Sequence, residues 1–282
     1  MSMTDLWFHE DHSEGVRFQI KIDKHLCSLH SEFQRLDIFE TVELGKMLVL
    51  DGILMITEKD EFVYHEMMVH VPMAVNPDIK SVLVIGAGDG GTVKRLTEYK
   101  GIEKIVVAEI DKLVVDKCKQ FFPDLTVGFD DKRVKLVYED GLKYVRNFEG
   151  AFDLIIVDST DPFGPGEGLF TREFYGNCHK ALGVNGILVN QHESPFYDSY
   201  KDTVTKTHEK LKAFFPICQV YQAHIPTYPS GHWLFGFSSK KYDGTDIKKE
   251  KWEENKIACQ YYNTDLHKGA FALPNYTKEL LR

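Results

Sequence analysis

The stretch from Ser81 to Val93 constrains the fold of this chain more than any other. Four apolar residues, Val82–Ile85, lead directly into a glycine-rich loop, and a helical pattern begins at Thr92. A strand, a tight turn and a helix start in this order form the first βα unit of a nucleotide-binding sheet. Glycines let the backbone approach a ligand closely, and the N–H groups at the helix start point toward it.

Beyond this unit, strands and helices alternate. Further buried-type strands are predicted at Ile105–Ala108, Val134–Val137, Leu154–Val157 and Ile187–Asn190. Such alternation predicts a mostly parallel sheet with helices on both faces. Two later β-rich runs, Ile217–Ala223 and Trp233–Ser238, are joined by a short connector and are expected to be antiparallel neighbours. The charged stretch Lys248–Glu254 is expected to form a solvated helix.

The N-terminal part has a different pattern. Apolar and polar residues alternate over Val16–Ile22, as in a half-buried strand. Asp51-Gly52 separates two apolar runs and is a strong hairpin signal. From Asp60 to Val75 the apolar spacing becomes helical. We therefore expect a small antiparallel β domain over residues 1–59, followed by an α/β domain over residues 60–282.

Composition excludes several classes of protein. The chain has 282 residues, 43% of them apolar, and a net charge of −9, so a nucleic-acid partner is not expected, and an acidic surface slightly favours a cationic ligand. No apolar run approaches the ~18 residues of a membrane helix, so no membrane partner is expected. Five scattered cysteines without a C-x-x-C pair indicate reduced thiols in the cytoplasm. His65 and His70 are five residues apart, which is wrong for a helical metal pair, and no metal is expected.

Acidic residues follow four successive predicted strands, where ligands bind in such sheets. Glu109 comes about 20 residues after the glycine loop, as expected of a contact to ribose hydroxyls, although it could also cap the next helix. Asp111 is better placed as the N-cap of that helix. Asp140-Gly141 suits a contact to an adenine amino group, with helix capping as the alternative.

Asp89 lies inside the glycine loop and limits the choice of ligand. If its carboxylate faces the site, a pyrophosphate or the carboxylate of S-adenosylmethionine at ~4 Å would be repelled by about 4 kcal/mol at an effective dielectric of ~20. A decarboxylated S-adenosylmethionine, whose tail ends in an ammonium group, would be attracted. If Asp89 turns to solvent, this argument does not apply.

A second acidic cluster follows the fourth of these strands. Asp158 and Asp161 are separated by two residues in a turn, so both carboxylates can face one small volume, although structural turns also use Asp. The Pro/Gly-rich segment 163–169 is expected to act as a lid. Three aromatic residues, Tyr64, Tyr228 and Trp233, are candidates to line an apolar channel for an alkyl chain, with core packing as the alternative for each.

Together these motifs closely resemble those of the spermidine synthases, the polyamine aminopropyltransferases. The resemblance covers nearly the whole chain in order, through Gln34, Asp60–Glu66, Gly86–Gly91, Glu109, Asp140-Gly141, Asp158–Pro162 and Ile225–Gly231. It implies a Rossmann-like methyltransferase-type sheet with a small N-terminal antiparallel β domain, usually assembled as a homodimer or homotetramer. It also implies transfer of an aminopropyl group from decarboxylated S-adenosylmethionine, a co-substrate rather than a cofactor, to putrescine, which gives spermidine and methylthioadenosine.

The resemblance assigns roles by position. Asp158 corresponds to the proton acceptor, which we expect the Tyr64 hydroxyl to assist. Positions that contact the thioadenosyl group are Gln34, Glu109, Asp140, Gly141 and Pro165. Positions that contact the aminopropyl and polyamine chains are Tyr64, His65, Asp89, Asp158, Ser159, Thr160 and Asp161, and Tyr228 lies beside that channel. Other members have Gln at the position of His65, and Ala87 replaces a common glycine.

Alternative functions remain open at this stage. The same scaffold could serve a putrescine N-methyltransferase that uses S-adenosylmethionine, or an aminopropyltransferase that prefers agmatine, cadaverine or spermidine. A non-catalytic polyamine-binding protein would keep the acids but need no lid. An NAD dehydrogenase would need a hydride-transfer site, which no motif supplies.

Overall fold

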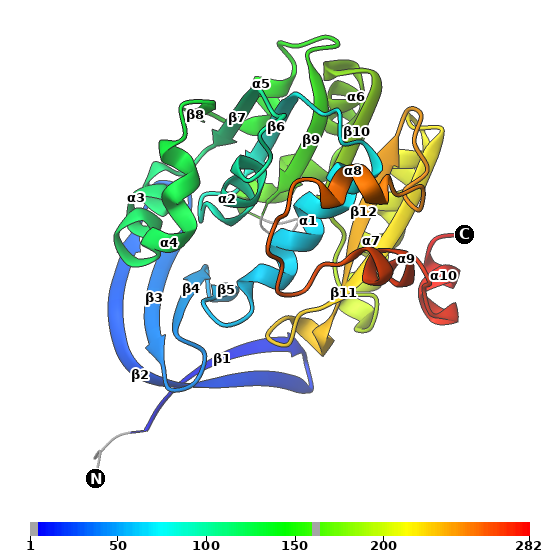
Figure 1. Ribbon diagram of the computed structural model, residues 1–282. Coiled ribbons are helices and arrows are strands. Elements are labelled where there is room, and N and C mark those ends of the chain that lie inside the picture. The colour runs from blue at the N-terminus through cyan, green and yellow to red at the C-terminus, as the bar shows by residue number, and fades with distance from the viewer. Residues whose placement is uncertain (1–4, 160–163) are drawn as a thin grey trace.

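The computed structural model describes residues 5–159 and 164–282, with the backbone alone at residues 164–165. Two β-sheets organise these residues, one of five strands and one of seven (Figure 1). The five-stranded sheet ends at Thr57, and helix α1 (Glu61–Val75) begins the second part of the chain. The predicted division at residue 59 therefore falls between the two sheets; that each part is a domain of its own stays a prediction.

The N-terminal sheet is an antiparallel meander in sequence order. Its strands are β1 (Leu6–Ser13), β2 (Val16–His30), β3 (Arg35–Thr41), β4 (Lys46–Leu50) and β5 (Ile53–Thr57). The predicted hairpin is present between β4 and β5, and both turn residues have positive φ, 50° at Asp51 and 86° at Gly52. This is the backbone that an Asp-Gly pair favours in a tight hairpin.

Period-two alternation gives this sheet two apolar faces. One face packs against α3 (Lys112–Phe121) and α4 (Pro123–Thr126), and its members include Ile38 and Leu48. The other face includes Met47 and Leu54 and contacts the ring of Tyr228. The N-terminal sheet therefore docks on the rest of the molecule through one face and reaches toward the Tyr228 loop with the other.

The seven-stranded sheet has the order β11-β12-β10-β9-β6-β7-β8. Its strands are β6 (Ser81–Gly86), β7 (Lys104–Glu109), β8 (Val134–Tyr138), β9 (Phe152–Asp158), β10 (Leu182–Gln191), β11 (Ile217–His224) and β12 (His232–Ser239). Strands β6 to β10 pair in parallel, and β12 pairs antiparallel with both β10 and β11. The Rossmann-like, methyltransferase-type fold class and the antiparallel pair of late strands are both confirmed.

Helices cover both faces of this sheet (Figure 1). Val82 and Val84 of β6 face the core shared with α1, α2 (Gly91–Thr97), α8 (Lys249–Glu253) and α9 (Thr264–Ala270). Leu83 and Ile85 face the core shared with α5 (Gly141–Val145), α6 (Arg172–Ala181) and α7 (Asp198–Lys212). The remaining helical segments are η1 (Val127–Asp130), η2 (Gly164–Phe170), η3 (Pro229–Gly231) and α10 (Asn275–Leu280). Within the described ranges, no helix has the length and apolarity to cross a bilayer.

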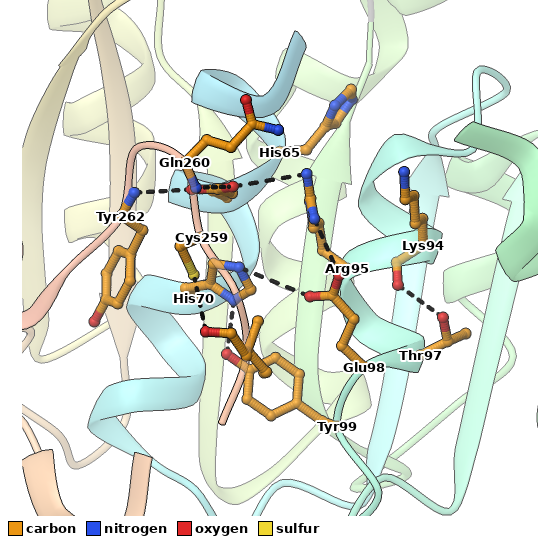
Figure 2. Close-up of polar contacts among 12 residues, drawn as sticks. His65, His70, Lys94, Arg95, Thr97, Glu98, Tyr99, Cys259, Gln260 and Tyr262 are labelled. Carbon is orange, nitrogen blue, oxygen red and sulfur yellow. Dashed lines mark hydrogen bonds and ion pairs between the residues drawn. The ribbon is translucent and has the colours of Figure 1, made fainter. Parts of the chain in front are cut away.

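The C-terminal segment is anchored on α1. Both carboxylate oxygens of the buried Glu66 accept hydrogen bonds from successive backbone N–H groups, those of Gln260, Tyr261 and Tyr262, at 2.8–2.9 Å. Figure 2 labels two of these donors, Gln260 and Tyr262. The expectation of a solvated helix at residues 248–254 is wrong in part. Helix α8 is present, but Trp252 on it is buried and donates its indole N–H to the Tyr99 hydroxyl.

Candidate active site

The site lies where the strand order reverses. Strand β6 has β7 on one side and β9 on the other, and ligands bind at such switch points, beyond the carboxyl ends of the strands. The Ala87 N–H donates to the Asp158 carbonyl oxygen at 2.9 Å. Gly86 has φ of +86°, and a Cβ there would lie 1.9 Å from that same oxygen. Only glycine at this position lets the loop lie directly beside Asp158.

A cleft opens at this point, between the two sheets, and its space including the part open to solvent is about 1190 Å³. The site residues predicted from the sequence that line it are Gln34, Tyr64, His65, Asp89, Glu109, Asp140, Gly141, Asp158, Ser159 and Tyr228. Thr160 and Asp161 lie outside the described residues. Pro165 lies in η2, and its side chain is also outside the description; Gly166 and Leu169 of the expected lid line the cleft.

Two helices, α3 and α5, begin beside one end of the cleft. Asp111 caps α3 through the Leu113 N–H at 3.0 Å, as predicted, and also accepts from the Gln34 side-chain amide at 3.0 Å. Asp140 caps α5 with one oxygen, as the alternative interpretation expected, and it also lines the cleft. Its contact to an adenine amino group stays a prediction. Burial raises the pKa of Glu109 to about 7, although its carboxylate accepts from the Asp111 N–H at 2.8 Å.

Asp158 is the last residue of β9, and its side chain lies partly buried in the lining of the cleft. Its Oδ2 accepts from the Thr92 hydroxyl at 2.6 Å, and it also accepts from the Tyr64 hydroxyl. Burial and then the nearby Asp89 charge raise the pKa of Asp158 to about 6, against the opposing effects of His65 and the two hydroxyl donors. Burial raises the pKa of the Tyr64 phenol well above its ordinary value, so Tyr64 stays protonated and donates.

Asp89 lines the cleft with His65 behind it. Asp89 Oδ1 accepts from the Gly91 N–H at 2.7 Å and lies 3.3 Å from His65 Nε2. The other ring nitrogen of His65, Nδ1, lies 2.6 Å from Glu61 Oε2. Burial disfavours the charged imidazole, but Asp89 and then Glu61 outweigh it and raise the pKa of His65 to about 10. Burial alone would raise the pKa of Asp89, but the nearby His65 has the larger, opposite effect. The pKa of Asp89 is therefore lowered from its ordinary value.

Aromatic rings form an apolar wall of the cleft. The ring centroid of Tyr228 lies 6.1 Å from that of Tyr64 and 4.9 Å from that of Trp233. The Tyr228 hydroxyl donates to the Met55 carbonyl oxygen at 2.7 Å, which ties this wall to the N-terminal sheet. The aromatic set proposed as a channel from the sequence therefore lines one cleft.

Two polar residues that line the cleft were missed from the sequence. Gln191 is the last residue of β10, beside β9, and the strand-end rule that found the acids also applies to it. Glu10 comes from β1, and its Oε2 accepts from the Leu54 N–H at 2.7 Å. No sequence signal indicated Glu10, because only the docking of the two sheets brings it to the site. Among the described residues, no group of three or more His, Cys, Asp or Glu side chains is placed to hold a metal ion.

Comparisons with known proteins agree with this geometry. Residues 61–249 match the model of the spermine/spermidine synthase domain, and residues 6–58 match that of the spermidine synthase tetramerisation domain. A polyamine aminopropyltransferase from Clostridium perfringens (strain SM101 / Type A) is 63% identical over 277 residues, with 98% of each chain covered. One from Alkaliphilus oremlandii (strain OhILAs) is 64% identical over 278 residues, again with 98% of each chain covered.

Solved structures extend the likeness to three dimensions. A crystal structure of spermidine synthase in complex with the transition-state analogue AdoDATO is 42% identical, with a TM-score of 0.95 over 98% of this chain and 94% of that one. The crystal structure of spermidine synthase from Thermotoga maritima is 41% identical, with a TM-score of 0.93 and the same coverage. The resemblance predicted from the sequence is confirmed: this chain belongs to the spermine/spermidine synthase family of polyamine aminopropyltransferases.

Proposed function

We propose that this chain transfers the aminopropyl group of decarboxylated S-adenosylmethionine to putrescine and releases spermidine and methylthioadenosine. The observation that carries the proposal is that Asp89 and Asp158 line one cleft, next to a glycine loop held against the end of β9. One carboxylate is placed to bind a cationic donor tail, and the other is placed to accept a proton. Gln34, Glu109 and Asp140 lie around the part of the cleft assigned to the thioadenosyl group.

The chemistry follows from the groups present. The neutral amine nitrogen attacks the carbon next to the sulfonium, the new C–N bond forms as the C–S bond breaks, and sulfur keeps the electron pair. The nitrogen must also lose a proton, and an alkyl ammonium has a pKa of ~10.4. Because the pKa of Asp158 is raised to about 6, the gap to the amine is about 4 units instead of ~6.5. Tyr64 donates to the same carboxylate and orients it.

Charge and shape favour this reaction over the alternatives. Asp89 lines the cleft, so the extra carboxylate of S-adenosylmethionine, and with it a methyltransferase, is disfavoured. The wall formed by Tyr64, Tyr228 and Trp233 suits the methylenes of a diamine, and it would also lower the pKa of the attacking amine. On the side of the N-terminal sheet, the Glu10 carboxylate lines the cleft, and we assign it to the second ammonium group of putrescine.

A product assay tests the proposal directly. The enzyme is incubated with putrescine and either sulfonium donor, and the products are separated and identified by mass. We expect spermidine and methylthioadenosine from the decarboxylated donor, and no methylputrescine from S-adenosylmethionine. Parallel reactions with agmatine, cadaverine and spermidine should all be slower than the reaction with putrescine. Methylputrescine as the product, or a faster reaction with another amine, would contradict the proposal.

The raised pKa of Asp158 predicts an acid limb in the rate. Asp158 accepts a proton only when ionised, so kcat at saturating substrates should fall about tenfold per pH unit once the pH drops below about 6. Burial is the main cause, so the limb should lie about two units above the ordinary Asp value of ~3.9. A rate that is flat between pH 8 and pH 5 would show that Asp158 is not the titrating group.

We also propose a homodimer or homotetramer that works in the cytoplasm without a cofactor. The match of residues 6–58 to a tetramerisation domain supports self-association, as do the exposed apolar side chains of Leu6, Trp7 and Val16 on the same sheet. The free thiols of all five cysteines support a reducing compartment. Sedimentation equilibrium would measure the oligomeric state.

A further inference from the structure

Glu61 is the first residue of α1 and does not itself line the cleft. One turn further along the helix is His65, and the 2.6 Å contact between Glu61 Oε2 and His65 Nδ1 is a close i,i+4 pair. The opposite ring nitrogen, Nε2, lies 3.3 Å from Asp89 Oδ1. The side chains of Glu61 and His65 are 11% and 1% exposed, so solvent screens this carboxylate–imidazole–carboxylate chain very little.

We propose that Glu61 is a positioning residue that cancels the charge of the His65 imidazolium. Asp89 then offers a full negative charge to the ammonium group of the donor. This inference rests on the function proposed above. With Glu61 present, the three groups carry one net negative charge. Without it, the imidazolium neutralises Asp89 and competes with the donor tail for the same carboxylate. Glu61 thus acts on donor binding through His65 and touches no substrate.

The surroundings of His65 leave few other groups that set its charge. From α1 it faces Glu61 and the ring of Tyr64, from the glycine loop Asp89, and from the end of β9 the Asp158 carboxylate. Gly91 also lies directly against the ring, since a Cβ there would lie 2.2 Å from the imidazole. The pKa of about 10 for His65 agrees with an imidazolium held between two carboxylates.

The first test is Glu61→Gln, which keeps the shape of the side chain and removes its charge. At pH 6.5 we expect the affinity for decarboxylated S-adenosylmethionine, measured by titration calorimetry, to fall at least about fivefold. Methylthioadenosine lacks the ammonium group, so its affinity should stay unchanged. Glu103→Gln removes an exposed carboxylate paired with Lys80 and serves as the matched control. Equal losses for both ligands in the Glu61 variant would show a merely structural role and overturn the proposal.

The second test follows the proton on His65. The chain has twelve histidines, and the NMR signal of His65 is the one that is missing from the spectrum of the His65→Gln variant. Loss of the Glu61 charge should lower the pKa of His65 by about 1 unit or more. The donor affinity of Glu61→Gln should then recover as the pH rises through this lowered pKa, because a neutral imidazole no longer cancels Asp89. An unchanged His65 titration, or a loss of affinity that is the same at every pH, would overturn the proposal.

The third test is a rescue. Adding His65→Gln to Glu61→Gln removes the cation and keeps an amide that is able to donate to Asp89. The double variant should therefore bind the donor at least about threefold more tightly than Glu61→Gln alone at pH 6.5. No recovery would show that Glu61 acts by another route. All three tests measure binding or titration, so a failure to make spermidine from putrescine would count against the proposed function and leave this inference standing on its own.

Discussion

Replacing Asp158 by asparagine is expected to lower kcat at least about a hundredfold, while the cleft still binds methylthioadenosine. Asparagine keeps the size of the side chain and can still accept from Thr92, but it cannot take a proton from the attacking amine. Two hydroxyl donors, Thr92 and Tyr64, converge on this carboxylate and hold it in one place. An ammonium nitrogen has no lone pair with which to attack, so the reaction would depend on the small fraction of amine that loses its proton without the help of Asp158.

The measurement is single-turnover kinetics with decarboxylated S-adenosylmethionine and putrescine, together with the affinity for methylthioadenosine. Asp116→Asn, which changes an exposed Asp on α3 that pairs with Lys112, controls for the loss of one acidic group. The residual rate of Asp158→Asn should also lack the acid limb near pH 6. Near-normal turnover in this variant would remove Asp158 from its role as proton acceptor.

Replacing Asp89 by asparagine is expected to change which donor binds. A carboxylate about 4 Å from an ammonium group contributes about 4 kcal/mol at an effective dielectric of ~20, so affinity for the decarboxylated donor should fall at least about a hundredfold. S-adenosylmethionine should bind more tightly than it does to the wild type, because its carboxylate would now meet an amide and the nearby His65 cation. Asparagine can still accept the Gly91 N–H, so the loop should keep its shape.

Calorimetry with both donors and with methylthioadenosine measures this change of preference. The methylthioadenosine affinity should change by less than about threefold, since the thioether product has no charged tail. The outcome to watch is the ratio of the two donor affinities. If that ratio is the same in Asp89→Asn as in the wild type, selection of the decarboxylated donor does not come from this carboxylate.

Features governed by neighbouring residues were predictable from the sequence. The apolar run Val82–Ile85 followed by glycines predicted β6 and its loop, and Asp51-Gly52 predicted the β4–β5 hairpin. Asp111 was predicted as the helix cap that it is. In a parallel sheet all carboxyl ends lie at one edge, so acids that follow successive strands must converge there. This rule predicts that Asp89 and Asp158 converge, and both line the same cleft.

Features that depend on long-range packing were not predictable in the same way. The Thr92 hydroxyl bonds to an oxygen 66 residues away in Asp158, and the Glu66 carboxylate holds a backbone segment nearly 200 residues further along. Trp252 looked solvated because its neighbours are charged, yet it packs against the core behind α1. Glu10 reaches the cleft only because the N-terminal sheet folds over it. No local pattern encodes such contacts.

Residues of both sheets line the cleft, so the preference for the amine and the preference for the sulfonium donor can change separately in evolution. The acids that we propose to bind the sulfonium donor lie mainly on loops of the parallel sheet, whereas Glu10 and Met55 belong to the antiparallel sheet. Substitutions along β1 and β5 should therefore change the amine that is aminopropylated and leave the sulfonium donor unchanged. We expect paralogues with new acceptors to differ first along β1 and β5.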